Sequence, residues 1–212
     1  MDTYILNIKD ECRKNLNRYT LRAFSVIPEI ENPTILDLGC GTGVSSLALI
    51  EKSNATICAV DIDPESINLF MEKVSTLGLE QRIKIFQGSV FNPDIFGHEF
   101  DIVLAEGLLN VVGFEKGLQA LVRHAKKGGF ILIHDELKND PEKRIIFESY
   151  NLKLLDSFIL DKDVWWNDYY DCLEKKIKSI NDNNQFENEL KEINGYKINP
   201  LNYRSIYYIL QR

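Results

Sequence analysis

Short apolar runs alternate with longer amphipathic stretches along the first two thirds of the chain. Five of these runs are rich in β-branched or aromatic residues and almost continuously apolar, which is typical of strands buried on both faces of a parallel sheet. The predicted strands are Thr34–Leu38, Thr56–Asp61, Ile83–Gln87, Phe100–Ala105 and Phe130–His134.

The stretches between these runs carry apolar residues three or four positions apart, as amphipathic helices do. The predicted helices are Val44–Lys52, Pro64–Leu77 and Phe114–Lys127. Gly78 is the expected C-terminal cap of the second helix, and Gly128 with Gly129 is expected to end the third. Alternation of strands and helices predicts an α/β fold with a parallel sheet and right-handed crossovers.

The last third of the chain departs from this alternation. Pro141–Asn151 is expected to be a helix, and Leu152–Leu160 and Tyr203–Gln211 are expected to be strands. The residues between these two strands are too many for a tight hairpin and carry apolar positions at helical spacing. We therefore predict one domain over 1–212, with a helical segment at 1–33 and a helical insert at 161–200 whose second helix stops at Gly195.

Composition and charge narrow the class of protein. The chain has 212 residues, which suits one α/β domain, and its net charge of -7 disfavours a nucleic acid partner. No window approaches the ~20 apolar residues of a membrane span, and the first residues resemble neither a signal nor a transit peptide. The four cysteines form no CxxC pair or metal-ligand cluster. A cytoplasmic protein without a metal, either monomer or homodimer, is expected.

A glycine-rich loop follows the first predicted strand. In Ile35–Gly43, with the letters ILDLGCGTG, an apolar strand runs into glycines at 39, 41 and 43, and a predicted helix follows. Glycine permits a positive φ and lets a ligand approach the backbone without a Cβ in the way. The helix N-terminus adds free N–H groups and the positive end of its dipole. The loop therefore predicts a binding site for a ligand with a carboxylate or a phosphate.

Spacing and charge around the loop favour one cofactor over another. Dinucleotide sites use a G-x-G-x-x-G pattern, whereas here Val44 stands at the third glycine position and the glycines run G-x-G-x-G. Asp37, just before the loop, would repel a pyrophosphate but attract an ammonium or a sulfonium group. S-adenosylmethionine carries both of these cations, so the pattern favours it over a dinucleotide.

Two acids at the end of the second predicted strand have separable roles. Asp61 lies 18 residues after Gly43 and is expected to bind the two ribose hydroxyls of the cofactor. Ile62 beside it can cover a face of the adenine. Asp63 precedes Pro64 and is expected to cap the following helix, a role that is also the alternative for Asp61.

These segments resemble a known family. The glycine loop resembles motif I of the class I S-adenosylmethionine-dependent methyltransferases, and Val60–Ile62 looks like the acidic second motif. The resemblance follows the strand and helix order from about residue 34 to 135, and motif I is its most specific part. It implies a doubly wound, mostly parallel seven-stranded sheet of order 3-2-1-4-5-7-6, with the last strand antiparallel and helices on both faces.

The resemblance also implies further site residues. The family often has an acid after the third strand that binds the adenine amino group, but this chain has Ser89 and Val90 there, and a hydroxyl binds more weakly. A plain loop hydroxyl is the alternative for Ser89. The fourth strand ends at Ala105 and Glu106, where open α/β sheets bind ligands. The residues expected to bind the cofactor are Asp37, Gly39, Cys40, Gly41, Thr42, Gly43, Asp61, Ile62, Ser89, Val90, Ala105 and Glu106.

The acceptor side of the site is less determined. Glu106 and His134 are the candidate catalytic residues, although Glu106 could instead cap a helix and His134 could be structural. Relatives that methylate DNA bases or glutamine carry an Asn/Asp-Pro-Pro-aromatic run after the fourth strand, and this chain has none. Tyr19, Trp165, Trp166 and Tyr169 are expected to line the substrate pocket. Packing of the insert onto the core is the alternative for the aromatic residues of the insert.

The function predicted from these features is methyl transfer from S-adenosylmethionine to a small-molecule acceptor by in-line displacement, with the protein aligning the reactants. Three alternatives stay open. A non-catalytic S-adenosylmethionine binder or scaffold would show binding without transfer. An aminopropyltransferase usually carries an additional N-terminal strand domain, and a nucleotide-dependent oxidoreductase needs the third glycine that this loop lacks.

Overall fold

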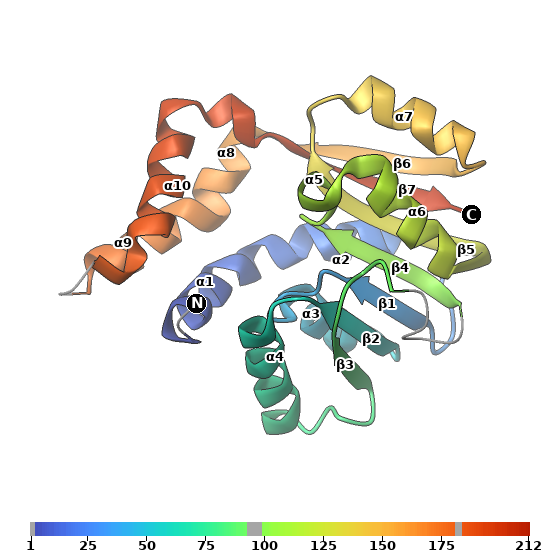
Figure 1. The fold of residues 1–212 in the computed structure, drawn as a ribbon, viewed down its shortest axis with the longest axis horizontal. Helices are drawn as coiled ribbons and strands as arrows, with labels where there is room; N and C mark the ends of the chain where they lie inside the picture. The colour runs from blue at the N-terminus through green and yellow to red at the C-terminus, as the bar shows by residue number, and fades with distance from the viewer. Residues whose placement is uncertain (1–2, 93–98, 181–183) are drawn as a thin grey trace.

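The computed structural model describes residues 3–92, 99–180 and 184–212, and its centre is one seven-stranded sheet (Figure 1). The strands are β1 (Thr34–Leu38), β2 (Thr56–Asp61), β3 (Ile83–Gln87), β4 (Phe100–Glu106), β5 (Ala125–Glu136), β6 (Lys153–Leu160) and β7 (Ser205–Gln211). Their order is β3-β2-β1-β4-β5-β7-β6, and β7 runs antiparallel to both of its neighbours, β5 and β6. The predicted fold class and strand order are confirmed.

Helices cover both faces of this sheet. One face packs against α2 (Asn17–Val26), α3 (Val44–Lys52) and α4 (Pro64–Thr76). The opposite face packs against α5 (Leu109–Val112), α6 (Phe114–His124) and α7 (Asp140–Ser149). Because the parallel strands are buried on both faces, their sequences are almost continuously apolar, and their carboxyl ends share one edge of the sheet.

Beside this edge lies a helical unit, which we call the cap (Figure 1). It consists of α1 (Thr3–Arg13), α8 (Lys162–Trp165), a π-helical turn (Trp166–Tyr170), α9 (Asp171–Lys178) and α10 (Glu187–Ile198). The cap has an apolar cluster of its own, separate from the two that line the sheet. The first helix of the chain thus packs with helices that come about 160 residues later, so the segments 1–33 and 161–200 are not independent of each other.

A disulfide joins the two parts of the cap. It links Cys12 on α1 to Cys172 on α9, with their Cα atoms 5.7 Å apart. The sequence spacing gives no sign of this pair, and such bonds are rare in a reducing compartment. No helix in the described parts of the chain is long and apolar enough to cross a membrane. The cytoplasmic location stays a prediction.

Three glycines were assigned wrong roles from the sequence, and Gly129 lies inside β5 together with Gly128. The third predicted helix ends at His124, and Gly128 lies inside β5, where a register shift in the pairing with β4 accommodates its φ of +78°. Gly195 does not stop a helix, because α10 continues to Ile198. A Cβ at Gly195 would lie 2.8 Å from the hydroxyl of Tyr203, so close packing explains this glycine.

Candidate functional site

Backbone hydrogen bonds hold the glycine loop against the end of β2. The N–H groups of Gly39 and Cys40 both donate to the carbonyl of Val60, at 2.9 and 3.0 Å. Gly43 N–H donates to the carbonyl of Cys40 at 2.9 Å, and Gly43 is the N-cap residue of α3. These bonds require the positive φ values of +75° at Gly39 and +78° at Gly43, which glycine adopts without strain.

The space around each of the three glycines shows where a ligand could approach the backbone. A Cβ at Gly43 would lie 2.2 Å from the ring of Phe70, and one at Gly39 would lie 3.0 Å from Leu108. At Gly41 a Cβ would meet no atom within 4 Å. Gly39 and Gly43 are therefore needed for packing, whereas the outer side of Gly41 is open. A ligand can lie directly on the backbone there.

Asp61 lies next to this open position. Its Oδ2 atom accepts the N–H of Gly41 at 2.8 Å, and its Oδ1 atom accepts the N–H of Asp63 at 2.9 Å. A carboxylate has about four acceptor positions, so each oxygen can still accept one hydroxyl. Ile62 projects beside it with 72% of its surface exposed. Asp63 caps α4 by accepting the N–H of Ser66 at 3.1 Å, as predicted, whereas the ribose role of Asp61 stays a prediction.

Asp37 is a buried acid beneath the loop. The hydroxyl of Ser46 donates to its Oδ2 atom at 2.6 Å. Burial, against the opposing hydrogen bond from Ser46 and with smaller contributions from the carboxylates of Glu106 and Asp61, raises the pKa of Asp37 to about 7. A cation placed beside Asp37 would favour its ionised form.

Glu106 ends β4 at the centre of a hydroxyl cluster. Its Oε1 atom accepts hydrogen bonds from Thr20 of α2 at 2.7 Å and Tyr207 of β7 at 2.8 Å. Its Oε2 atom accepts the hydroxyl of Ser45 of α3 at 2.5 Å. Thr20 and Ser45 did not emerge from the sequence, because single hydroxyl residues on helices carry no local signal. The three donors fix the carboxylate at the carboxyl end of the sheet.

His134 occupies the neighbouring position on β5, paired in register with Glu106. Its ring stacks on Tyr207, with centroids 4.4 Å apart, and lies 5.9 Å from Trp165. Its Nε2 atom lies 2.8 Å from the hydroxyl of Ser205. Burial lowers the pKa of His134, so the neutral ring is favoured near pH 7. A neutral imidazole can accept a proton, yet its stacking and hydrogen bond also suit a structural role.

Tyr19 connects this cluster to the cap. Its hydroxyl donates to Oδ2 of Asp168 at 2.8 Å, and Arg18 donates to the same oxygen at 2.5 Å. Asp168 lies on the π-helical turn, a rare conformation that is frequent at functional sites. Asp168 is the acid within the aromatic segment 165–170, with the letters WWNDYY. This placement could have marked it as a candidate, but the sequence analysis did not select it.

Comparison with known proteins relates the chain to methyltransferases. A family model described as a methyltransferase domain matches residues 35–129. Release factor glutamine methyltransferase from Aquifex aeolicus is 26% identical over 147 residues, which cover 55% of this chain and 52% of that protein. A SAM-dependent methyltransferase from Thiobacillus denitrificans, solved with S-adenosyl-L-homocysteine, shares the fold with a TM-score of 0.71 at 14% identity, covering 92% and 91% of the two chains. The resemblance to the class I S-adenosylmethionine-dependent methyltransferases that the sequence predicted is confirmed by these matches.

The same fold also occurs with other chemistry. A (4+2) cyclase has a TM-score of 0.78 with this chain at 12% identity, covering 92% of this chain and 81% of the cyclase. Identity this low shows the fold alone. The matched region also covers only about half of the Aquifex aeolicus relative. The reaction therefore does not follow from the likeness and depends on the residues of the site.

The remaining predicted residues of the candidate site lie in two environments. Ser89 turns its hydroxyl towards the N–H of Phe91 at 3.3 Å, and Val90 and Ala105 are buried. Trp166 stacks on Tyr196 within the cap, with centroids 5.7 Å apart. Tyr169 is 1% exposed in the apolar cluster of the cap. The structure thus brings Trp165 to His134 and joins Tyr19 to Asp168, whereas Trp166 and Tyr169 pack within the cap.

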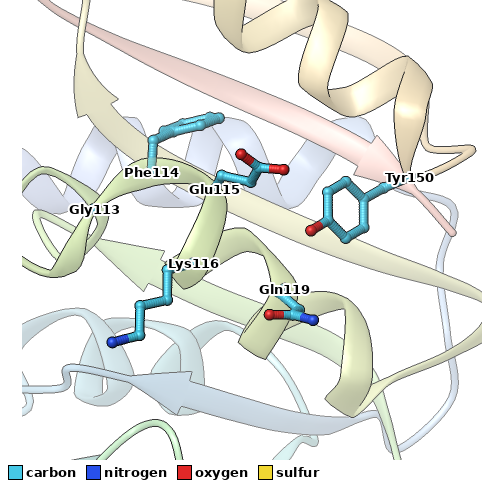
Figure 2. Close-up of a pocket in the computed structure, with 6 residues that line it drawn as sticks. All are labelled: Gly113, Phe114, Glu115, Lys116, Gln119 and Tyr150. Atoms are coloured by element: carbon cyan, nitrogen blue, oxygen red, sulfur yellow. The ribbon is translucent and has the colours of Figure 1, made fainter.

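Two further features lie apart from this site. Within the described residues, no group of three or more His, Cys, Asp or Glu side chains is placed to hold a metal ion. Figure 2 shows a hollow of about 470 Å³ beside the start of α6. It is lined by Gly113, Phe114, Glu115, Lys116, Gln119 and Tyr150. None of these residues belongs to the glycine loop or to the Glu106 cluster.

Proposed function

We propose that this protein transfers the methyl group of S-adenosylmethionine to a small-molecule acceptor. The observation that supports it most is the pairing of Asp61 with the open backbone at Gly41, where a ribose diol and the rest of the cofactor can be held together. The match of residues 35–129 to a methyltransferase domain model and the likeness to a structure solved with S-adenosyl-L-homocysteine support the same cofactor.

The residues on the cofactor side divide the binding between them. Asp61 would hold the ribose hydroxyls and Ile62 would cover the adenine. The open side of Gly41 would receive the methionine part of the cofactor, and Asp37 would balance its positive charge. The bound cofactor supplies a methyl group on a sulfonium, which is its own leaving group. The task of the chain is then alignment of the two reactants and exclusion of water.

The acceptor would bind over the carboxyl ends of β4 and β5. Glu106 and His134 lie there, the ring of Trp165 from the cap stacks 5.9 Å from that of His134, and Tyr19 bonds Asp168 of the cap. Glu106 would orient the acceptor, and either Glu106 or the neutral His134 would take a proton from an acceptor that must lose one. A small molecule suits this site, because the chain is acidic and the cap lies beside the edge where the acceptor would enter.

A transfer assay tests this proposal. The purified protein is incubated with S-adenosylmethionine and separate pools of small amines, alcohols, phenols, thiols and carbon nucleophiles, and formation of S-adenosylhomocysteine is followed. We expect turnover with at least one pool and none with Asp61→Ala. Binding of S-adenosylmethionine without turnover in any pool would favour a non-catalytic binder instead.

A further inference from the structure

Asp10 makes a buried contact with the glycine loop from a distant part of the chain. It is 5% exposed on α1, and its Oδ1 atom accepts the hydroxyl of Thr42 at 2.6 Å. Lys73 of α4 pairs with its Oδ2 atom and also donates to the backbone carbonyl of Thr42 at 3.0 Å. Thr42 is therefore held through its side chain by one helix and through its backbone by another.

The place of Thr42 in the loop makes this contact important. It stands between Gly41 and Gly43, which both have positive φ values, and glycine loses more conformational freedom on ordering than any other residue. Thr42 carries the side chain between these two glycines, and its anchor adds to the bond that Asp61 makes with the N–H of Gly41. An anchor on Thr42 therefore orders the open backbone at Gly41 before a ligand arrives, which is the physical basis of preorganised binding.

Asp10 is also the point where the cap meets the loop. Ile5, Ile8 and Cys12 of the same helix belong to the apolar cluster of the cap. Lys9 pairs with the buried Glu189 of α10 at 3.2 Å. Helix α1 is thus part of the cap, and its Asp10 accepts a hydrogen bond from Thr42 of the glycine loop.

We propose that Asp10 is a positioning residue that couples docking of the cap to the shape of the cofactor loop, and this rests on the proposed binding of S-adenosylmethionine. When the cap is docked, Asp10 and Lys73 hold Thr42 and the loop is ready for the cofactor. When Asp10 is removed, the loop must be ordered by the ligand itself, so the affinity falls while the rest of the site is unchanged.

The test compares S-adenosylhomocysteine affinity by titration calorimetry with loop protection by amide hydrogen exchange. In Asp10→Ala we expect an affinity about 10-fold weaker and faster exchange at residues 39–43 in the free protein. The double variant Asp10→Ala with Lys73→Met avoids leaving a lone half-buried charge and should show the same two changes. Glu11→Ala is the matched control, since Glu11 is the next acid on α1 and pairs with Lys176 within the cap.

The outcomes separate this role from the proposed function. Weaker binding and faster loop exchange in both Asp10 variants, with Glu11→Ala like the wild type, would support the positioning role. Unchanged affinity and exchange in the folded double variant would overturn it while leaving the proposed cofactor in place. If the wild type itself bound no S-adenosylhomocysteine, the proposed function would fall, and loop exchange alone would decide whether Asp10 orders the loop.

Discussion

The hydroxyl of Tyr207 donates to Oε1 of Glu106 at 2.8 Å across an intervening strand. His134 lies between them in register, paired with Glu106 on β4 and with Tyr207 on β7. A row of three side chains therefore crosses the sheet at the carboxyl end of its parallel strands. The antiparallel last strand, which supplies Tyr207, contributes directly to the candidate acceptor site.

This row predicts a difference between two neighbouring tyrosines. Tyr207 and Tyr208 both donate to carboxylates at 2.8 Å, Tyr207 to Glu106 and Tyr208 to Asp140 on the opposite face of the sheet. Each change to phenylalanine should lower the unfolding free energy by about 1–2 kcal/mol in urea titrations. Only Tyr207→Phe should also reduce the transfer rate, because Glu106 loses a donor that orients it. Equal rates in the two variants would contradict a role for this row in the site.

Alanine substitutions at two glycines of the loop should affect ligand binding and stability differently. Gly41→Ala places a Cβ in open space, so its cost is the strain of a positive φ, about 1–2 kcal/mol, while the Cβ occupies the ligand's position. Gly43→Ala drives a Cβ into the ring of Phe70 and should disturb the core as well. Thermal unfolding and calorimetric titration should show Gly41→Ala folded but deficient in cofactor binding, and Gly43→Ala clearly less stable. A Gly41→Ala protein with wild-type affinity would show that the ligand does not lie there.

The raised pKa of Asp37 predicts proton release on cofactor binding. With a pKa of about 7, the free carboxyl is about half protonated at pH 7, and a bound cation favours its ionised form. Affinity for S-adenosylmethionine should therefore rise between about pH 6 and pH 8. Calorimetry at pH 7 in buffers of different ionisation enthalpy measures the released proton, and Asp37→Asn should release none. A binding enthalpy independent of the buffer would place the cation elsewhere.

The pH dependence of stability that Asp37 causes has the opposite sign to that of a salt-bridged acid. Its folded pKa lies above the ordinary value of 3.8, so the folded state binds the proton more tightly than the unfolded state. The contribution of Asp37 to the unfolding free energy is fully present below pH 3.8 and is lost as the pH rises through about 7. In the free protein, Asp37→Asn should remove this part of the pH dependence.

The disulfide predicts that the cap responds to reducing agents. Cys12 and Cys172 are joined, while Cys40 and Cys58 are free thiols. Thiol titration of the denatured protein should find two groups before reduction and four after it. Because the bond closes a long loop, its reduction should lower the unfolding free energy by about 2–4 kcal/mol. Cys58→Ser is the control, and its stability loss on reduction should equal that of the wild type. Four thiols in protein purified under oxidising conditions would show that the bond does not form.

Local sequence pattern predicted the features that depend on neighbouring residues. The glycine loop, the acids after β2 and the apolar strands follow from residues close together in the chain, and the strand order followed from the family resemblance. Asp10, Asp168 and the Cys12–Cys172 pair were missed because each acts on a partner far away in sequence, for which periodicity carries no information. Gly195 was misread because a helix tolerates a glycine where another side chain, here Tyr203, packs closely.

Titration of the protein with S-adenosylmethionine tests the central claim most directly. The wild type should bind with micromolar affinity, and Asp61→Ala should lose binding because the ribose contact and the bond to Gly41 are both removed. Asp63→Ala is the control, since it removes only the cap of α4 and should cost about 1 kcal/mol of stability without loss of affinity. A folded wild type that binds no S-adenosylmethionine, or an Asp61→Ala variant that binds as well as the wild type, would contradict the account.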